Sequence, residues 1–136
     1  MTFKWTRRPD TANTDYYPTG ASAEKMAESW LGRQGLVLLQ RNFHCKQGEI
    51  DLIMQDRDIL VFVEVRFRKS SAYGFAAETV TASKQRKLIL AAQNYLLHNK
   101  PARHKPMRFD VIGIMPKNPD GYDYNWLQNA FMGIVD

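Results

Sequence analysis

Acidic residues interrupt two stretches of the chain that are otherwise apolar. Glu49 and Asp51 alternate with apolar residues, and Glu64 lies within the apolar stretch 59–67. Carboxylates are rarely buried without a partner, and two that face each other across paired strands repel unless a proton or a cation lies between them. Mg²⁺ prefers oxygen ligands and is often bound by one or two carboxylates together with water and phosphate. The pattern therefore favours a site for Mg²⁺ or Mn²⁺ that acts on phosphate esters.

A tight turn joins the two acidic strands and predicts their register. Asp56, Arg57 and Asp58 are typical turn residues between extended segments. If the loop has two residues, hairpin geometry sets Asp51 opposite Glu64. The two carboxylates are then close enough to share one cation.

The same register sets Glu49 opposite Arg66, so that the polar side chains share one face of the hairpin. Apolar residues of both strands should turn the other way, toward the core: Ile50, Leu52, Val61, Val63 and Val65. An ordinary polar face is the alternative interpretation. In that case Glu49 pairs with Arg66, while neighbouring cations neutralise Asp51 and Glu64.

The elements that would position these residues follow from periodicity and capping. Apolar residues at helical spacing predict a helix from Gly20 that ends near Gly35, and a second helix that begins after Thr81 or Ser83 and ends near Asn99. Period-two or continuous apolar segments predict five strands, at residues 36–44, 49–54, 59–67, 107–115 and 124–128. The expected fold is α/β, in the order αβββαββ, with the first three strands as a meander.

Composition indicates one small domain. The chain has 136 residues, of which 44% are hydrophobic, so a single core is expected over residues 20–136, preceded by a flexible arm at residues 1–19. The one cysteine, Cys45, excludes an internal disulfide and favours a small packing role. No apolar run is long enough to span a membrane and no leader pattern follows Met1, which predicts a cytoplasmic protein without a membrane partner.

Positive charge is concentrated in one part of the chain. The net charge is +5, yet residues 66–108 carry ten Lys and Arg against a single carboxylate, Glu78. Such a segment favours a polyanionic partner, for which nucleic acid is the commonest candidate. Solvated cations on helix faces are the alternative interpretation. Lys84 and Gln85 lie near the expected start of the second helix, where free backbone amides favour phosphate.

The motifs together resemble a known family. Gly20–Ala27, Gly48–Ile53, Val61–Arg66 and Arg108–Val111 match, in order and spacing, the YraN family of uncharacterised bacterial proteins over roughly residues 20–131. That family is similar to the restriction-endonuclease-like superfamily, which includes the Holliday-junction resolvases. The resemblance implies a mixed β-sheet flanked by helices, with a signature of Asp followed by Glu-x-Lys on the next strand.

Carried over, the resemblance makes Glu24, Asp51 and Glu64 the metal ligands and places Arg66 at the position of the signature lysine. An arginine stays protonated and cannot act as a base, but it can bind phosphate with two donors. With no lysine at that position, the metal must activate the water. For Glu24 the alternative is a solvated helix residue beside Glu28.

The expected function is hydrolysis of phosphodiester bonds in DNA, with branched DNA as one candidate substrate and a homodimer as one candidate assembly. The catalytic residues would be Asp51, Glu64, Arg66 and Glu24, and DNA would contact Arg68, Lys69, Lys84, Gln85, Arg86 and Lys87. A nucleic-acid-binding module without turnover is the main alternative, which the arginine at position 66 favours. A structural domain that binds an acidic protein is a third hypothesis.

Overall fold

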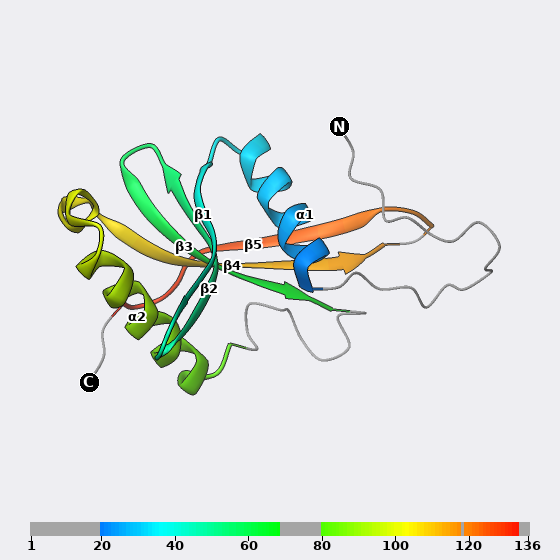
Figure 1. Ribbon diagram of the computed structural model, residues 1–136. Helices are drawn as coiled ribbons and strands as arrows, with labels where there is room; N and C mark the ends of the chain where they lie inside the picture. The colour runs from blue at the N-terminus through cyan, green and yellow to red at the C-terminus, as the bar shows by residue number, and fades with distance from the viewer. Residues whose placement is uncertain (1–19, 69–79, 118, 134–136) are drawn as a thin grey trace.

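The computed structural model describes residues 20–68, 80–117 and 119–133, and it shows a mixed sheet with a helix on each face (Figure 1). The elements are α1 (Gly20–Arg33), β1 (Val37–Cys45), β2 (Gly48–Asp56), β3 (Ile59–Phe67), α2 (Ala82–Leu97), the 3-10 helix η3 (Lys100–His104), β4 (Met107–Pro116) and β5 (Tyr122–Phe131). This order confirms the expected α/β succession, to which η3 is an addition. The expected arm at residues 1–19 lies outside the described residues.

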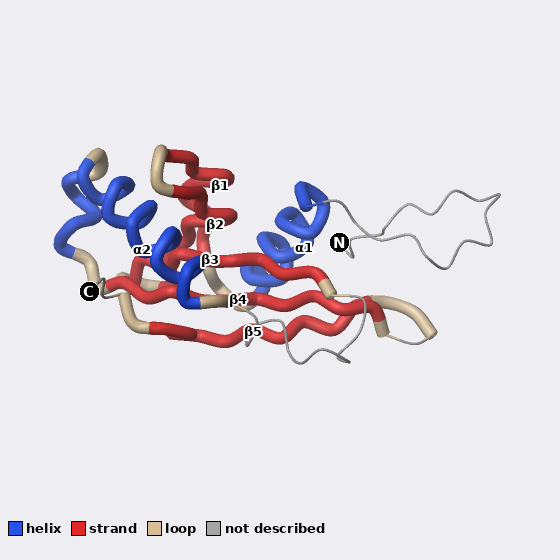
Figure 2. The backbone as a smooth tube through the Cα atoms, turned by 90° about the horizontal axis from the view of Figure 1, so that it is seen from below, coloured by secondary structure: helices blue, strands red, loops and turns tan. Residues whose placement is uncertain are grey.

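The sheet has the order β1-β2-β3-β4-β5. β1, β2 and β3 form the expected antiparallel meander, β3 and β4 are parallel, and β5 returns antiparallel. A parallel neighbour requires a crossover, which the segment containing α2 supplies. Figure 2 shows β3, β4 and β5 running side by side, with the β1–β2 hairpin turned out of their plane.

The turn between β2 and β3 has the predicted two-residue loop. Asp56 pairs with Ile59, and the pairing continues to Leu52 opposite Val63, which is the register expected from the sequence. Arg57 adopts a φ of 56°, as one residue of such a tight loop often must.

Both faces of the central strands are covered, which corrects the prediction of one polar and one apolar face. Alternation places Ile53 and Phe62 on the same side of their strands as the carboxylates, yet both are fully buried against α2. Leu52, Val61 and Val63 pack on the opposite face against α1. Alternation cannot distinguish a half-exposed strand from one that is covered on both sides. Glu64 is buried and Asp51 half-buried, whereas Glu49 is exposed.

Local signals explain the ends of the helices. Of the two candidate caps for α2, Thr81 is the one observed, and its Oγ1 accepts a hydrogen bond from the Lys84 amide at 3.1 Å. α2 ends at Leu97, two residues before the expected Asn99, which instead precedes η3. After α1, Gly35 adopts a φ of 104°, where a side chain would be strained. No helix in the described ranges is long and apolar enough to cross a membrane.

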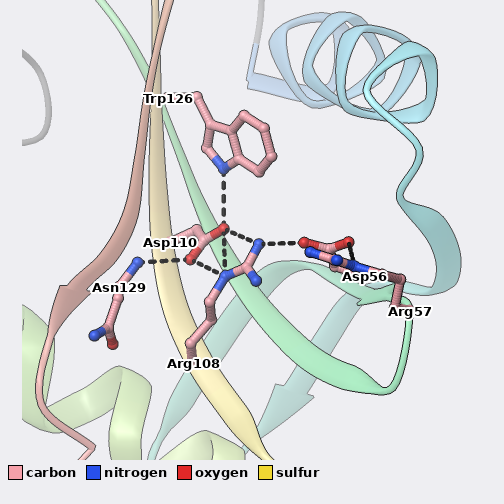
Figure 3. A network of polar contacts seen from close by, with 6 residues as sticks. All are labelled: Asp56, Arg57, Arg108, Asp110, Trp126 and Asn129. Carbon is pink, nitrogen blue, oxygen red and sulfur yellow. Dashed lines mark hydrogen bonds and ion pairs between the residues drawn. The ribbon is translucent and has the colours of Figure 1, made fainter.

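A buried network ties β5 and the β2–β3 turn to β4 (Figure 3). Asp110, 1% exposed, accepts hydrogen bonds from the side chains of Arg108 and Trp126 and from the Asn129 backbone amide, at 2.9–3.2 Å. Arg108 also pairs with Asp56 at 3.0 Å. The acidic residue of the Arg108–Val111 motif is thus fully satisfied by the fold itself.

Candidate metal and phosphate site

The site forms where β2 and β3 separate. Their pairing ends at Leu52 and Val63, although β3 stays paired with β4 as far as Phe67. At the point of separation Oδ2 of Asp51 accepts a hydrogen bond from the Val65 backbone amide at 2.8 Å. The aspartate side chain therefore takes the place of a backbone acceptor, which fixes its carboxylate between the two strands.

Three carboxylates meet at this point, and we call Glu24, Asp51 and Glu64 the acid cluster. They come from α1, β2 and β3, so that the cluster joins the sheet to the helix on one of its faces. Asp51 is the central member, since it shares side-chain hydrogen bonds with both Glu24 and Glu64. The structure thus brings together the three residues that the sequence singled out.

Burial and mutual repulsion perturb the titration of the cluster. Burial, and next the charge of Asp51, raise the pKa of Glu64 to about 7, and the same two causes raise the pKa of Glu24 to about 7. Burial also raises the pKa of Asp51, although the Val65 amide opposes this rise. Near neutral pH, protonated Glu24 and Glu64 donate to Asp51, and a divalent cation would compete with those protons.

Two cations border the acid cluster at Glu64. Arg66 Nε lies 3.3 Å and Lys84 Nζ 3.8 Å from Glu64 Oε2. Lys84 reaches this position from the first turn of α2, so a lysine does stand beside the carboxylates even though residue 66 is an arginine. From the sequence, Lys84 was expected only among the DNA contacts, because local spacing does not show where α2 lies on the sheet.

Glu49 does not pair with Arg66, contrary to the register extrapolated along the hairpin. β2 has left β3 by this point, and Glu49 instead lies opposite His44 of β1, with His44 Nδ1 3.1 Å from its Oε2. Arg66 turns to Glu64 on its own strand. The ordinary polar-face interpretation thus loses its Glu49–Arg66 pair but keeps cations beside Glu64.

The donor chemistry suits a hard divalent cation. The cluster offers only carboxylate oxygens, the ligands that Mg²⁺ and Mn²⁺ prefer. Among the described residues, no three or more His, Cys, Asp or Glu side chains form a ready-made metal group. The arrangement fits an ion held by one or two carboxylates and completed by water and phosphate, which is the common mode for Mg²⁺.

The expected DNA-contacting residues have different surroundings. Gln85 donates through Nε2 to the Val80 carbonyl at 3.1 Å, which gives its side chain a local role at the start of α2. Arg86 and Lys87 are exposed on α2, and Arg68 is half-buried beyond the end of β3. Lys69 lies outside the described residues.

A further neighbour of the acid cluster was not singled out from the sequence. The side chain of Asn42, in β1, hydrogen-bonds to Glu24. An asparagine among polar residues of an exposed strand carries no signal of its own, and only the three-dimensional placement of α1 against β1 identifies it.

Comparison with known proteins places the chain among relatives of unestablished function. Residues 23–114 match the model described as "Uncharacterised protein family UPF0102". A UPF0102 protein of Alcanivorax borkumensis is 52% identical over 113 residues, covering 83% of this chain and 90% of the relative. One from Saccharophagus degradans is 53% identical, covering 83% and 92%. These matches confirm the resemblance to the YraN family and name no activity.

Proposed function

The chain belongs to the uncharacterised protein family UPF0102, and from this premise and the acid cluster we propose that it is a metal-dependent nuclease. The reaction proposed is hydrolysis of phosphodiester bonds in DNA with Mg²⁺ or Mn²⁺. The restriction-endonuclease-like relationship suggested by the sequence motifs is part of this proposal, as is a cytoplasmic location.

One observation carries the proposal: buried, mutually repelling carboxylates lie beside two cations. Glu64 is 5% exposed, has a side-chain hydrogen bond with Asp51 and has Arg66 and Lys84 within 4 Å of its carboxylate. Repulsion among carboxylates in a partly buried site lowers the stability of the fold, so a structural role alone does not account for the cluster. A bound divalent cation would offset this repulsion and could bind phosphate.

Each residue has a distinct role in this proposal. Asp51 and Glu64 would hold the ion, and Glu24 would complete the site as a third ligand. A bound Mg²⁺ would lower the pKa of a water molecule and stabilise the leaving oxygen. Arg66 would bind the scissile phosphate with its planar guanidinium, and Lys84 would balance the charge that develops there.

Lys84 could compensate for the arginine that stands at the position of the signature lysine. The signature lysine lies two residues after the glutamate on the same strand, where this chain has Arg66. A lysine ammonium from α2 lies 3.8 Å from Oε2 of Glu64, the same oxygen that Arg66 approaches. We propose that Lys84 supplies the local charge that the signature position would supply.

The positive charge of α2 favours nucleic acid as the substrate. Lys84, Arg86 and Lys87 lie along the first turns of α2, and Lys84 reaches Glu64 of the acid cluster. Phosphate contacts by such residues make binding to DNA depend steeply on salt. Branched DNA is a candidate substrate, and a homodimer would supply the two sites needed to cut both strands.

Cleavage assays test the proposal. Purified protein is incubated with supercoiled plasmid and with a four-way junction, with Mg²⁺ or Mn²⁺ and with chelator. We expect cleavage that needs metal, its loss in Asp51→Asn with DNA affinity largely kept, and a loss of about tenfold or more in Lys84→Gln. Glu28→Gln on α1 is the matched control, since Glu28 pairs with Arg41 instead of joining the cluster.

Two results contradict the nuclease hypothesis. Full activity of Asp51→Asn would remove the acid cluster from the mechanism. DNA binding without cleavage under any metal condition would favour the second candidate, a binding module without turnover, which Arg66 at the signature position supports. Binding that is insensitive to salt would contradict both.

A further inference from the structure

Asn42 has a backbone conformation that is unusual within a strand. Its φ is 49°, in the left-handed region that side chains other than glycine rarely adopt. Two other non-glycine residues in the described ranges share this conformation, Arg57 and Asn129. Arg57 lies in the tight turn after β2, and Asn129 directs its backbone amide to Asp110 at an irregularity of the β4–β5 pairing.

Asn42 lies neither at a turn nor at the shift in the β1–β2 register. Arg41 pairs with Leu52 and Phe43 with Ile50, and the pairing skips Asn42 and Asp51, which occupy the intervening position of the two strands. The shift recorded for this pair of strands lies earlier, between Leu38 and Gln40. Strain of this kind persists only where the surroundings impose it, and it is concentrated at functional sites.

The side chain of Asn42 contacts the acid cluster. Its carboxamide is exposed and donates a hydrogen bond to the carboxylate of Glu24, which in turn contacts Asp51. We propose that Asn42 is a positioning residue that holds the Glu24 carboxylate against Asp51 in the acid cluster. Its effect on metal binding rests on the proposed nuclease function, whereas the positioning itself does not.

The first test compares two glycine substitutions. Asn42→Gly and Asn129→Gly both place glycine at a strand position with positive φ, where glycine is not strained. Both variants keep the backbone amide, so residue 129 still donates its hydrogen bond to Asp110. We expect similar, small changes in melting temperature. Mn²⁺ affinity, measured by calorimetry with the metal alone, should fall about tenfold in Asn42→Gly and stay unchanged in Asn129→Gly. A purely structural Asn42 would change melting without this selective loss of affinity.

The second test needs no metal. A double-mutant cycle between Asn42→Gly and Glu24→Ala, followed by urea unfolding with chelator present, measures the contact directly. We expect a coupling of about fivefold in the unfolding equilibrium constant.

The outcomes separate the two hypotheses. Absence of coupling overturns the positioning role, and so does Mn²⁺ affinity in Asn42→Gly equal to that of the unsubstituted protein. Coupling in a protein that takes up no Mn²⁺ supports the positioning role and overturns the metal-dependent nuclease instead.

Discussion

Asp51→Asn tests whether the acid cluster is held together at a cost to stability. The amide keeps the shape of the side chain, and its oxygen can still accept the Val65 amide hydrogen bond. What it removes is the central negative charge, which helps to raise the pKa of both Glu24 and Glu64. Without metal, the variant should therefore be more stable than the unsubstituted protein at high pH.

The sign follows from proton uptake. The pKa of Glu64 is about 7 in the folded protein and about 4.5 in the unfolded chain, so that the folded state binds more protons between these pH values. Stability is then greatest at or below pH 4.5 as far as this group is concerned, and it falls as pH rises through 7. Glu24 acts in the same direction, with a smaller effect because solvent screens its more exposed carboxyl.

The magnitude follows from Glu64. Moving the pKa of a carboxyl from 4.5 to about 7 corresponds to about 3 kcal/mol between its protonation states. Burial is the larger cause and remains in the variant, so Asp51→Asn should recover the smaller, Coulombic part. We expect a gain of about 1 kcal/mol at pH 8 and little gain at pH 5.

Urea unfolding at pH 5 and pH 8, with chelator present, measures this gain. Adding Mn²⁺ should then stabilise the unsubstituted protein at pH 8 and have little effect on Asp51→Asn. A variant less stable than the unsubstituted protein at pH 8 would refute the reasoning, because Asp51 would then act chiefly as a structural acceptor for β3.

Two further measurements follow from the same contacts. Mn²⁺ binding near pH 6.5 should release protons, because Glu24 and Glu64 must ionise to bind the metal. Calorimetry in buffers of different ionisation enthalpy detects this release. For the same reason, Mn²⁺ affinity should rise between pH 6 and pH 8. Binding without proton release would contradict the raised pKa values. Asp110→Asn should lower the free energy of unfolding by about 3 kcal/mol, since it breaks a buried pair with Arg108, and should leave Mn²⁺ affinity intact; a loss of affinity would connect this network to the site.

Local chemistry accounts for the parts of the fold that the sequence predicts well. Turn residues 56–58 determine the loop length, and the loop length determines the β2–β3 register. Thr81 and Gly35 act within a few residues of the helix ends they define. These features depend on neighbours along the chain, so a single sequence suffices to identify them.

Features that depend on distant contacts were not predictable in this way. Ile53 and Phe62 look like one side of a half-polar hairpin until α2 covers them. The extrapolated Glu49–Arg66 pair does not form because β2 pairs with β3 only from Leu52 to Asp56. No local signal marks the residue at which this pairing stops. Lys84 reaches Glu64 only because the crossover to the parallel strand β4 brings α2 back over the sheet.

The two groups of inward-facing carboxylates indicate which one is available for binding. Asp110 has hydrogen bonds to both of its oxygens from an arginine, an indole and a backbone amide, so it needs no further partner. The acid cluster has three carboxyls and two neighbouring cations, and its members are joined by side-chain hydrogen bonds that require protonated carboxyls. Protons can be exchanged for a divalent cation, whereas the donors around Asp110 belong to the fold. Negative charge left over after folding therefore distinguishes the candidate binding site from the structural network around Asp110.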